Sequence, residues 1–451
     1  MGVKQLKVDV NELTIGMFVS GLDRPWTQTP FPLQGFFVRD MDELKQLKSH
    51  CSHVYIDVAR GRGPVATNLK PLAVPGGRPK PPSRSASSSA PSVPVAPLKI
   101  RRNAYPPPNP LKKEVQRAQV LHQNVFNAVS EVVDQLERDY TVPVQETKRA
   151  ASEMVDSVIR NPDAFTWLTR VQEKDEHTYA HSVRSAVWAI LFGRHIGLGK
   201  KDLDTLAMGV LLKDVGKVHL DESLLMQQTR GQEREAEYEQ FIELGVNILR
   251  ESQVEPRVIA VVKTHCERLN GSGFPSHLQG DKIPLLGKIA GIVTYYDDTT
   301  NPRGEKYPLS PSKAVAQLYQ LRDLEFQSEL VVEFIRAIGL YPTGTLVELT
   351  SGEVGVVVEQ NFERRLKPKV MLVLDAYKEV LESPALLDLA EQEQEVQALI
   401  DSGKRRLDEV EKLEIARDLE PGSYDIDIAQ IRDDYLFRKQ RKPWYSIFSR
   451  A

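Results

Sequence analysis

Apolar residues recur with a helical period through the middle of the chain. Between residues 109 and 340 the period holds over five stretches: 112–139, 144–159, 181–195, 202–212 and 235–250. A spacing near 3.6 residues places such residues on one face of a helix, where they can pack into a core. The pattern therefore predicts an all-α domain over residues 111–340.

The period changes to two after Tyr341-Pro342. Residues 345–349 and 354–359 alternate around Ser351-Gly352, which predicts a β-hairpin, and residues 369–375 (KVMLVLD) predict a third strand. These strands define a small β-unit over residues 341–380. Residues 381–451 form an extension that is acidic and helical over 386–419. It ends in the basic, aromatic sequence LFRKQRKPWYSIFSR, which is either a frayed tail or a tail that docks on a membrane surface or a partner.

The first 70 residues predict a small α+β module. Residues 4–10 and 53–58 alternate as strands do, and residues 41–49 have a helical pattern. No cluster of catalytic residue types occurs there, so we interpret the module as a sensing or docking unit. The fold class is therefore multidomain, with a small α+β N-terminal module, an all-α domain, and a small C-terminal β-unit with a helical extension.

Residues 71–110 separate the module from the helical domain. They contain 12 of the 29 prolines, a serine-rich core, six Lys or Arg and no acidic residue. Such a composition buries too little apolar surface to offset the entropy of ordering. The segment is predicted to be a disordered linker, either a plain tether or a contact for an acidic partner.

Composition narrows the function classes. The 451 residues are 41% hydrophobic and 27% charged with a net charge of -3, which describes a globular protein and argues against DNA as a partner. The two cysteines exclude a disulfide framework and a multi-cysteine metal site. No signal peptide or membrane-length apolar run occurs, so we expect a cytoplasmic protein with no transmembrane segment.

Residue types that carry chemistry gather at three places in the helical domain. His177 and His181 lie four residues apart and share a helix face, and the sequence KDVGK (213–217) follows an apolar run. HCE (265–267) precedes NGSGFP (270–275). A single feature of this kind is usually structural, but three in this order within about 100 residues indicate a site.

In this order the features resemble the HD-GYP family of bacterial cyclic-di-GMP phosphodiesterases, a branch of the HD superfamily. The matching stretches are HTYAHS (177–182), LLKDVGK (211–217), THCERLNGSGFP (264–275) and IVTYYDDTT (292–300). The resemblance covers residues 110–340 and implies an HD-type helical domain. The flanking units are similar to those of an HD-GYP subgroup with an N-terminal domain of unknown function.

The resemblance implies a centre of iron or manganese ions that generates hydroxide and hydrolyses cyclic-di-GMP. It implies that Asp214 and Lys217 are catalytic. The metal candidates that it gives are His177, His181, Asp214, His265 and Cys266, and the ligand-binding candidates are Lys217, Arg268, Gly271, Gly273 and Pro275.

Several positions depart from the family pattern. Lys213, Phe241 and Thr294 replace three expected metal ligands, and Cys266 replaces a histidine. Phe274 and Asn270 also differ from the family's loop. Lys213 beside Asp214 would repel a divalent cation, so it either takes the place of a metal or extends to solvent. The metal site is predicted to be incomplete.

Three functions remain open. The first is a degenerate HD-GYP regulator that binds cyclic-di-GMP, a related cyclic dinucleotide or a signalling-protein partner, with lost or weak activity. The second is an active phosphodiesterase with iron or manganese, and the third is a protein–protein scaffold with no cofactor. Metal content and calorimetric binding of cyclic-di-GMP would distinguish the three.

Overall fold

The chain forms two compact units in a computed structural model, Met1–Ser92 and Val93–Ala451. The structure describes residues 5–24, 36–38, 41–57, 95–101, 104–139, 141–170, 177–227, 230–303, 308–362, 364–402 and 413–437. Most of the predicted linker, residues 71–94, and the basic tail from residue 438 onward lie outside the described residues.

The N-terminal unit is a sheet with one helix. Its elements are β1 (Gln5–Asp9), β2 (Phe18–Leu22), β3 (Phe36–Phe37), α1 (Met41–His50) and β4 (His53–Asp57). The strands pair in the order β1-β4-β2-β3, all antiparallel. Val8, Val54 and Ile56 from the strands and Leu47 from α1 are buried, as alternation on a half-covered sheet requires. The predicted α+β module is confirmed.

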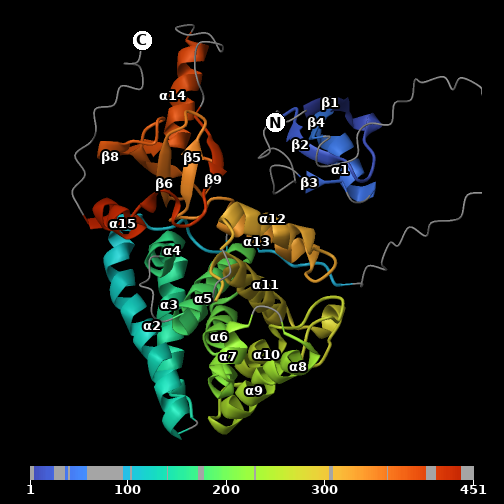
Figure 1. The fold of residues 1–451 in the computed structure, drawn as a ribbon, viewed down its shortest axis with the longest axis vertical. Coiled ribbons are helices and arrows are strands. Elements are labelled where there is room, and N and C mark those ends of the chain that lie inside the picture. Colours follow the sequence, from blue (N-terminus) through green and yellow to red (C-terminus); the bar gives the residue numbers. More distant parts are fainter. Residues whose placement is uncertain are drawn as a thin grey trace, which may run out of the picture. The chain divides into compact units, whose positions relative to one another are not determined.

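The second unit begins with a helical body, drawn from cyan through yellow to orange in Figure 1. Its elements in chain order are α2 (Leu111–Asp139), α3 (Val144–Arg160), α4 (Pro162–Arg170), α5 (His177–Ile196), α6 (Lys200–Leu211), the 3₁₀ turn η3 (Val215–His219), α7 (Glu222–Met226), α8 (Gln232–Glu239), α9 (Phe241–Glu251), α10 (Pro256–Thr264), the 3₁₀ turn η4 (Gly280–Lys282), α11 (Leu285–Thr300), α12 (Pro311–Gln320) and α13 (Ser328–Ile338). The predicted all-α domain is confirmed.

Aromatic side chains fill the centre of this body. Trp188 and Phe192 of α5 meet Tyr296 of α11 and Phe334 of α13 with ring centres 5.3–5.5 Å apart. The edge-to-face arrangement is the one that aromatic pairs favour. This core fixes α5 against α11, the two helices that carry one side of the site described below.

One predicted helix, 235–250, is two helices in the structure. α8 ends at Glu239 and α9 begins at Phe241, with Gln240 between them. The backbone of η3 lies against this point, because a Cβ built on Gly216 would sit 1.9 Å from the carbonyl oxygen of Phe241. The helical period of the sequence continues across the junction and gave no sign of the break.

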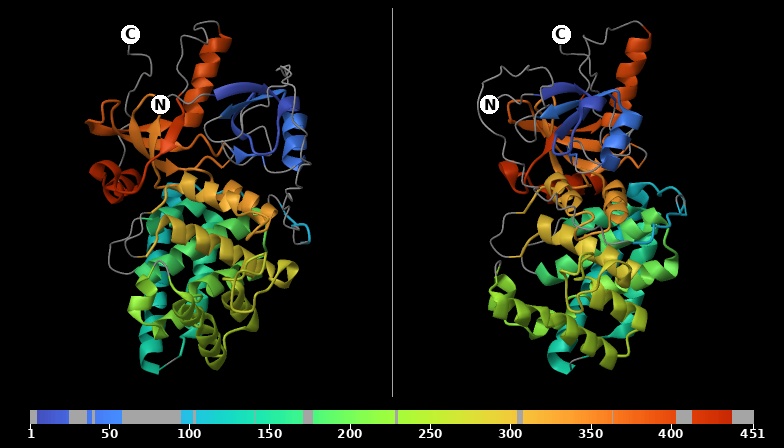
Figure 2. Two further views of the ribbon diagram at one scale, coloured as in Figure 1. Left: turned by 45° about the vertical axis from the view of Figure 1, so that its right-hand side comes forward. Right: turned by 90° about the vertical axis from the view of Figure 1, so that its right-hand side faces the viewer.

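A five-stranded antiparallel sheet lies at one end of the helical body (Figures 1 and 2). Its strands are β5 (Leu346–Leu349), β6 (Val354–Glu359), β7 (Lys369–Leu374), β8 (Val380–Asp388) and β9 (Ile415–Asp418), in the order β8-β7-β6-β5-β9. The hairpin and the third strand match the sequence pattern. Trp167 of α4 donates from Nε1 to the carbonyl of Val358 over 2.7 Å, which joins the helical body to β6.

The predicted boundary at residue 380 and the helical reading of residues 386–419 were wrong in part. Residues 380–388 form β8, which pairs with β7 from Lys369↔Asp388 to Leu374↔Val380. Residues 415–418 form β9 on the far edge of the sheet. Among the residues that the structure describes after β8, α-helix is confined to α14 (Leu389–Asp401) and α15 (Ile428–Phe437).

The described part of the predicted linker lies along the helical body. Backbone groups of Arg101 and Asn109 donate to Ile196 and Arg160, and the Tyr105 hydroxyl donates to the carbonyl of Leu198. These hydrogen bonds supply partners that composition could not reveal, so residues 95–101 and 104–110 are part of the second unit. Among the described residues no helix is long and apolar enough to cross a membrane.

Candidate functional site

A lysine–aspartate pair directly follows α6 and forms the centre of the site. Apolar residues of α6 pack into the helical body, and the helix ends with Leu212 as its C-cap. Lys213 and Asp214 come next and are buried, with 1% and 7% of each residue exposed. Lys213 therefore does not extend to solvent. A buried ammonium group needs partners, because losing water without replacing its hydrogen bonds is strongly unfavourable.

The Lys213 ammonium lies between a carboxylate and an imidazole. Nζ contacts Oδ2 of Asp214 and lies 2.7 Å from Nε2 of His181, in α5. The same Nε2 lies 3.7 Å from Oδ2 of Asp214 and 3.4 Å from Oδ1 of Asp298. Imidazole nitrogen and carboxylate oxygen are the donors that hold divalent metals in proteins. Here they surround the end of a side chain.

His181 is oriented by a buried carboxylate that sequence reasoning missed. Its Nδ1 lies 2.7 Å from Oδ2 of Asp297 in α11, and Nε of Arg184 donates to Oδ1 of Asp297 over 3.1 Å. Because Nε2 can only accept from an ammonium, Nδ1 carries the proton and donates to Asp297. Burial would raise the pKa of Asp297, but Arg184 and His181 outweigh it and hold that pKa below its usual range.

Lys217 supplies a second cation from η3. Its Nζ lies 2.7 Å from Oδ1 of Asp214 and 4.8 Å from the centre of the Phe241 ring. Burial would lower the pKa of Lys217, but the Asp214 carboxylate outweighs it and raises that pKa. The ring of Phe241 thus presents its face to an ammonium group, a favourable cation–π contact, and offers no donor to a metal.

Two lysines therefore neutralise one carboxylate. Burial alone would raise the pKa of Asp214, but the charges of Lys213 and then Lys217 hold it well below its usual range. A divalent ion near Asp214 would meet two fixed positive charges, and the repulsion is strong because the surroundings are buried.

His265 and Cys266 lie on the other side of this centre, after α10. Nδ1 of His265 lies 2.8 Å from the carbonyl of Val262 and donates to it. Burial, together with Lys213, lowers the pKa of His265 to about 3, so the ring is neutral at pH 7. Burial raises the pKa of Cys266 to about 12, so without a metal it carries a neutral thiol at pH 7.

Residues 270–279 form a loop that Glu267 holds in place. The buried Glu267 carboxylate accepts hydrogen bonds from the backbone N–H groups of Ser276, over 2.8 Å, and Leu278, over 2.9 Å. Gly271 has φ +82°, which favours glycine, and a Cβ on Gly273 would sit 2.3 Å from the carbonyl oxygen of Cys266. Glu267, another residue that the sequence reasoning gave no role, determines the shape of the loop.

Arg268 has partners within the protein. Its guanidinium donates to the carbonyls of His265 and Glu267, lies 3.5 Å from Glu325 and stacks on Phe326. The arginine predicted to meet a phosphate is thus held in place at the base of the loop.

The remaining candidates differ in what the structure describes. The side chain of His177 lies outside the described residues. Oγ1 of Thr294, in α11, is buried and has no hydrogen-bond partner in the part of the chain that the structure describes. Pro275 lies in the loop with Gly271 and Gly273.

The donors present do not fit a divalent metal centre. Within the described ranges no three His, Cys, Asp or Glu side chains are grouped so that they could hold a metal ion. His181 and Asp214 are close together, but the Lys213 ammonium lies against both. The cation that lies beside these donors is therefore the ammonium group of Lys213, which is part of the chain itself.

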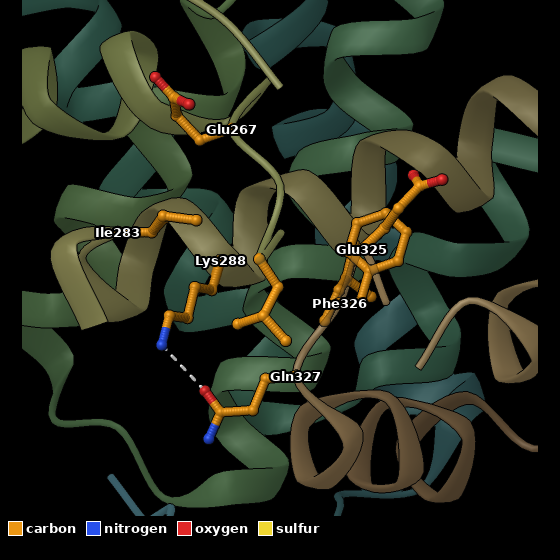
Figure 3. A pocket seen from close by; sticks show the side chains of 8 residues that line it. Glu267, Ile283, Lys288, Glu325, Phe326 and Gln327 are labelled. Carbon is orange, nitrogen blue, oxygen red and sulfur yellow. Dashed lines mark hydrogen bonds between the residues drawn. The ribbon is translucent and has the colours of Figure 1, made fainter. Parts of the chain in front are cut away.

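A pocket lies beside Glu267, the residue that anchors the loop. Apolar side chains of Leu269, Ile283, Ile292 and Phe326 line it together with Glu267, Lys288, Glu325 and Gln327. Figure 3 shows Lys288 and Gln327 pointing toward each other across its edge, where Nζ donates to Oε1 over 3.0 Å. Glu267 therefore connects this pocket to the loop.

Comparison with known proteins gives two family matches. Residues 5–147 match a domain of unknown function, DUF3391, and residues 169–330 match the HD domain. Relatives include a cyclic di-GMP phosphodiesterase of Pseudomonas aeruginosa, 27% identical over 85% of this chain and 88% of that protein. A 3'3'-cGAMP-specific phosphodiesterase of Vibrio cholerae is 29% identical over 37% of this chain and 33% of that protein.

Among solved structures, an HDG"Y"P protein from Bdellovibrio bacteriovorus aligns with a TM-score of 0.43 and 14% identity. The alignment covers 73% of this chain and 98% of that chain.

Proposed function

Since the chain is an HD-domain protein of the HD-GYP type with an N-terminal DUF3391 domain, we propose that it is a regulator in bacterial cyclic-di-GMP signalling. Its HD domain binds a cyclic dinucleotide or a partner of that network and has lost most or all phosphodiesterase activity. The two cysteines, both free thiols, support a cytoplasmic location.

The position of Lys213 carries the proposal. A hydrolase of this type needs a metal that lowers the pKa of a bound water and stabilises charge on phosphorus. The Lys213 ammonium takes up the donors of His181 and Asp214, and it carries one positive charge with no open coordination position for water. Phe241 adds an aromatic face where another ligand would be needed.

Lys217 and the loop support binding. Lys217 retains an exposed fraction of 18% of its side chain, and we propose that its ammonium, which pairs with Asp214, also contacts a phosphate oxygen of the ligand. Gly271, Gly273 and Pro275 present a loop with little side-chain bulk beside it. Arg268 supports this loop from its base, and we propose that it positions the loop rather than meeting phosphate through its own side chain.

An active phosphodiesterase is the second candidate, because a relative that matches 85% of this chain carries that name. His181, Asp214, Lys217 and His265 are still close together here. For turnover, metal would have to displace the Lys213 ammonium from Asp214, against the charge of Lys217 as well.

The experiment measures metal content, binding and turnover on the full chain. We expect less than stoichiometric iron or manganese, calorimetric binding of cyclic-di-GMP without added metal, and no hydrolysis with either metal supplied. Lys217→Ala should weaken binding about tenfold or more. Lys282→Ala, which removes an exposed lysine from η4, is the matched control and should bind as the parent does.

Two results would contradict the proposal. Two equivalents of metal with hydrolysis that is lost in Asp214→Ala would establish the enzyme. Neither metal nor nucleotide binding would leave only the scaffold function.

A further inference from the structure

A short extended segment is attached to the helical body through both backbone groups of one residue. The N–H of Ala96 donates to Oδ2 of Asp281 in η4 over 2.8 Å. Its carbonyl accepts from Nε2 of Gln327, the N-cap of α13, over 3.2 Å. The N–H of Ala96, followed by Lys288, holds the pKa of Asp281 below its usual value.

Lys288 joins the two side chains that hold Ala96. Its Nζ lies 3.2 Å from Oδ1 of Asp281 and 3.0 Å from Oε1 of Gln327, at the edge of the pocket in Figure 3. The three side chains form one hydrogen-bonded group. If Ala96 leaves, Asp281 and Gln327 each lose a partner at the same time.

Asp281 lies two residues after the end of the loop 270–279. The N–H of Gly280 donates to the carbonyl of Leu269, which closes the loop at its base. Glu267 lines the same pocket as Lys288 and Gln327, and it holds the N–H groups of Ser276 and Leu278. The attachment of Ala96 and the anchoring of the loop therefore share one set of packed residues.

Residues 95–101 make few other contacts that attach them to the helical body. Val95, Leu98 and Ile100 are only half-buried, and Ala96 itself is exposed. Arg101 is held at the next point along, where its N–H donates to the carbonyl of Ile196. A segment with so few buried contacts opens locally at low free energy. In the chain it is also the direct covalent continuation of the stretch that leaves the N-terminal unit.

We propose that residues 95–101 form a strap whose attachment at Ala96 restrains the loop 270–279. Release of the strap loosens the anchor at Asp281 and Gln327 and increases opening of the loop. That this opening changes nucleotide binding rests on the proposed function, whereas the mechanical coupling does not.

The test uses Ala96→Pro in the full chain. Proline removes the N–H that Asp281 accepts, and Pro97 already restricts residue 96 to the extended conformations that proline tolerates. We expect faster tryptic cleavage after Lys99, and hydrogen exchange about fivefold faster at the amides of Ser276 and Leu278, read by mass spectrometry. Asp281→Ala removes the other partner and should give the same two changes.

Two controls accompany these variants. Lys282→Ala changes an exposed residue next to Asp281 and should alter neither the cleavage nor the hydrogen exchange. Circular dichroism identifies any variant that fails to fold. The double variant should match Asp281→Ala alone, since that change already removes the hydrogen bond to Ala96 together with the contact to Lys288. The coupling is overturned if cleavage after Lys99 becomes faster while hydrogen exchange at Ser276 and Leu278 stays unchanged. It is also overturned if neither single variant makes that cleavage faster. Because no readout involves nucleotide, a failure to bind cyclic-di-GMP would not affect this result.

Discussion

Lys213 is a buried cation whose stability depends on its two partners. The Asp214 carboxylate and the His181 imidazole replace the water that the ammonium lost. Removal of the ammonium leaves the carboxylate buried with Lys217 on one oxygen only. Lys213 thus links the fold and the chemistry of the site.

We expect Lys213→Ala to lower the free energy of unfolding toward the lower end of about 3–5 kcal/mol, because Lys217 still faces Asp214. Lys213→Met keeps most of the volume and separates the loss of charge from the loss of packing. Urea unfolding at pH 7 measures both variants. Parent-like stability in Lys213→Met as well as Lys213→Ala would mean that the ammonium contributes nothing to the fold.

Lys213→His should convert repulsion into coordination. The new imidazole would join His181 and Asp214 as a third donor and remove one positive charge. We expect a rise in melting temperature on adding manganese that the parent does not show. A variant with no response to manganese would indicate that Phe241 and Lys217 still prevent binding.

His265 predicts an acid-dependent loss of stability. Its folded pKa, about 3, is depressed below the unfolded value of about 6.5, so the unfolded chain takes up the proton first as pH falls. Its contribution is complete above about pH 6.5 and decreases below it, by about 2 kcal/mol at pH 5. Unfolding of the parent and of His265→Gln at pH 7 and pH 5 should show a smaller decrease in the variant. Equal decreases would assign the acid sensitivity elsewhere.

The sequence indicated the residues at the centre of the site, but it did not indicate the residues whose hydrogen bonds position them. Lys213, Asp214 and His181 stand in short motifs of unusual residue types, which is why spacing finds them. Asp297 and Glu267 act through bonds to His181 and to loop amides, and no local pattern shows which distant atom a carboxylate meets. The signal that could have found Asp297 and Glu267 is an acidic residue within otherwise buried surroundings.

At the scale of elements, η3 is held against α9 by two glycines. A Cβ on Gly216 would lie 1.9 Å from the carbonyl oxygen of Phe241 and 2.6 Å from the backbone N of Gly245. Neither neighbour is a flexible side chain, so the two elements would have to separate. That separation would move Lys217 away from Asp214 and Phe241.

Gly216→Ala should therefore destabilise the second unit by about 1–3 kcal/mol or more and weaken nucleotide binding along with Lys217→Ala. Gly231→Ala is the matched control, because no atom lies within 4 Å of its Cβ position and its φ is -71°. Chemical unfolding measures both. Equal stability of the two variants would mean that η3 and α9 can separate freely.

Helices α2, α3, α5 and α6 were predictable because each buries an apolar face, whereas two strands were not. β8 (VLESPALLD) contains Glu, Ser and Pro, which are poor strand formers, and it is a strand because Val380 and residues 385–388 pair with β7. β9 is four residues long, and its partners in β5 lie 66 to 71 residues earlier in the chain. Pairing at such a distance overrides local preference.

For the whole molecule, the composition of residues 71–94 and the hydrogen bonds from residue 96 onward lead to a sharp expectation. A broad-specificity protease should cut first within 71–94, because Pro/Ser-rich sequence lacks buried apolar groups. The larger product should begin near residue 95 and retain the helical body and the sheet together, since Trp167 joins them. Mass spectrometry of the products identifies the first cut. Early cleavage within residues 180–300 would mean that the stable unit is misplaced.

The proposed replacement of a metal by Lys213 has a consequence for how the site obtains its positive charge. The cation is synthesised with the chain, at one per molecule, and neither a chelator nor iron starvation can remove it. It undergoes no redox change, so oxidants that alter a bound iron leave it untouched. Under the proposed function, the site therefore holds the same cation in every growth condition, and its response is set by the nucleotide.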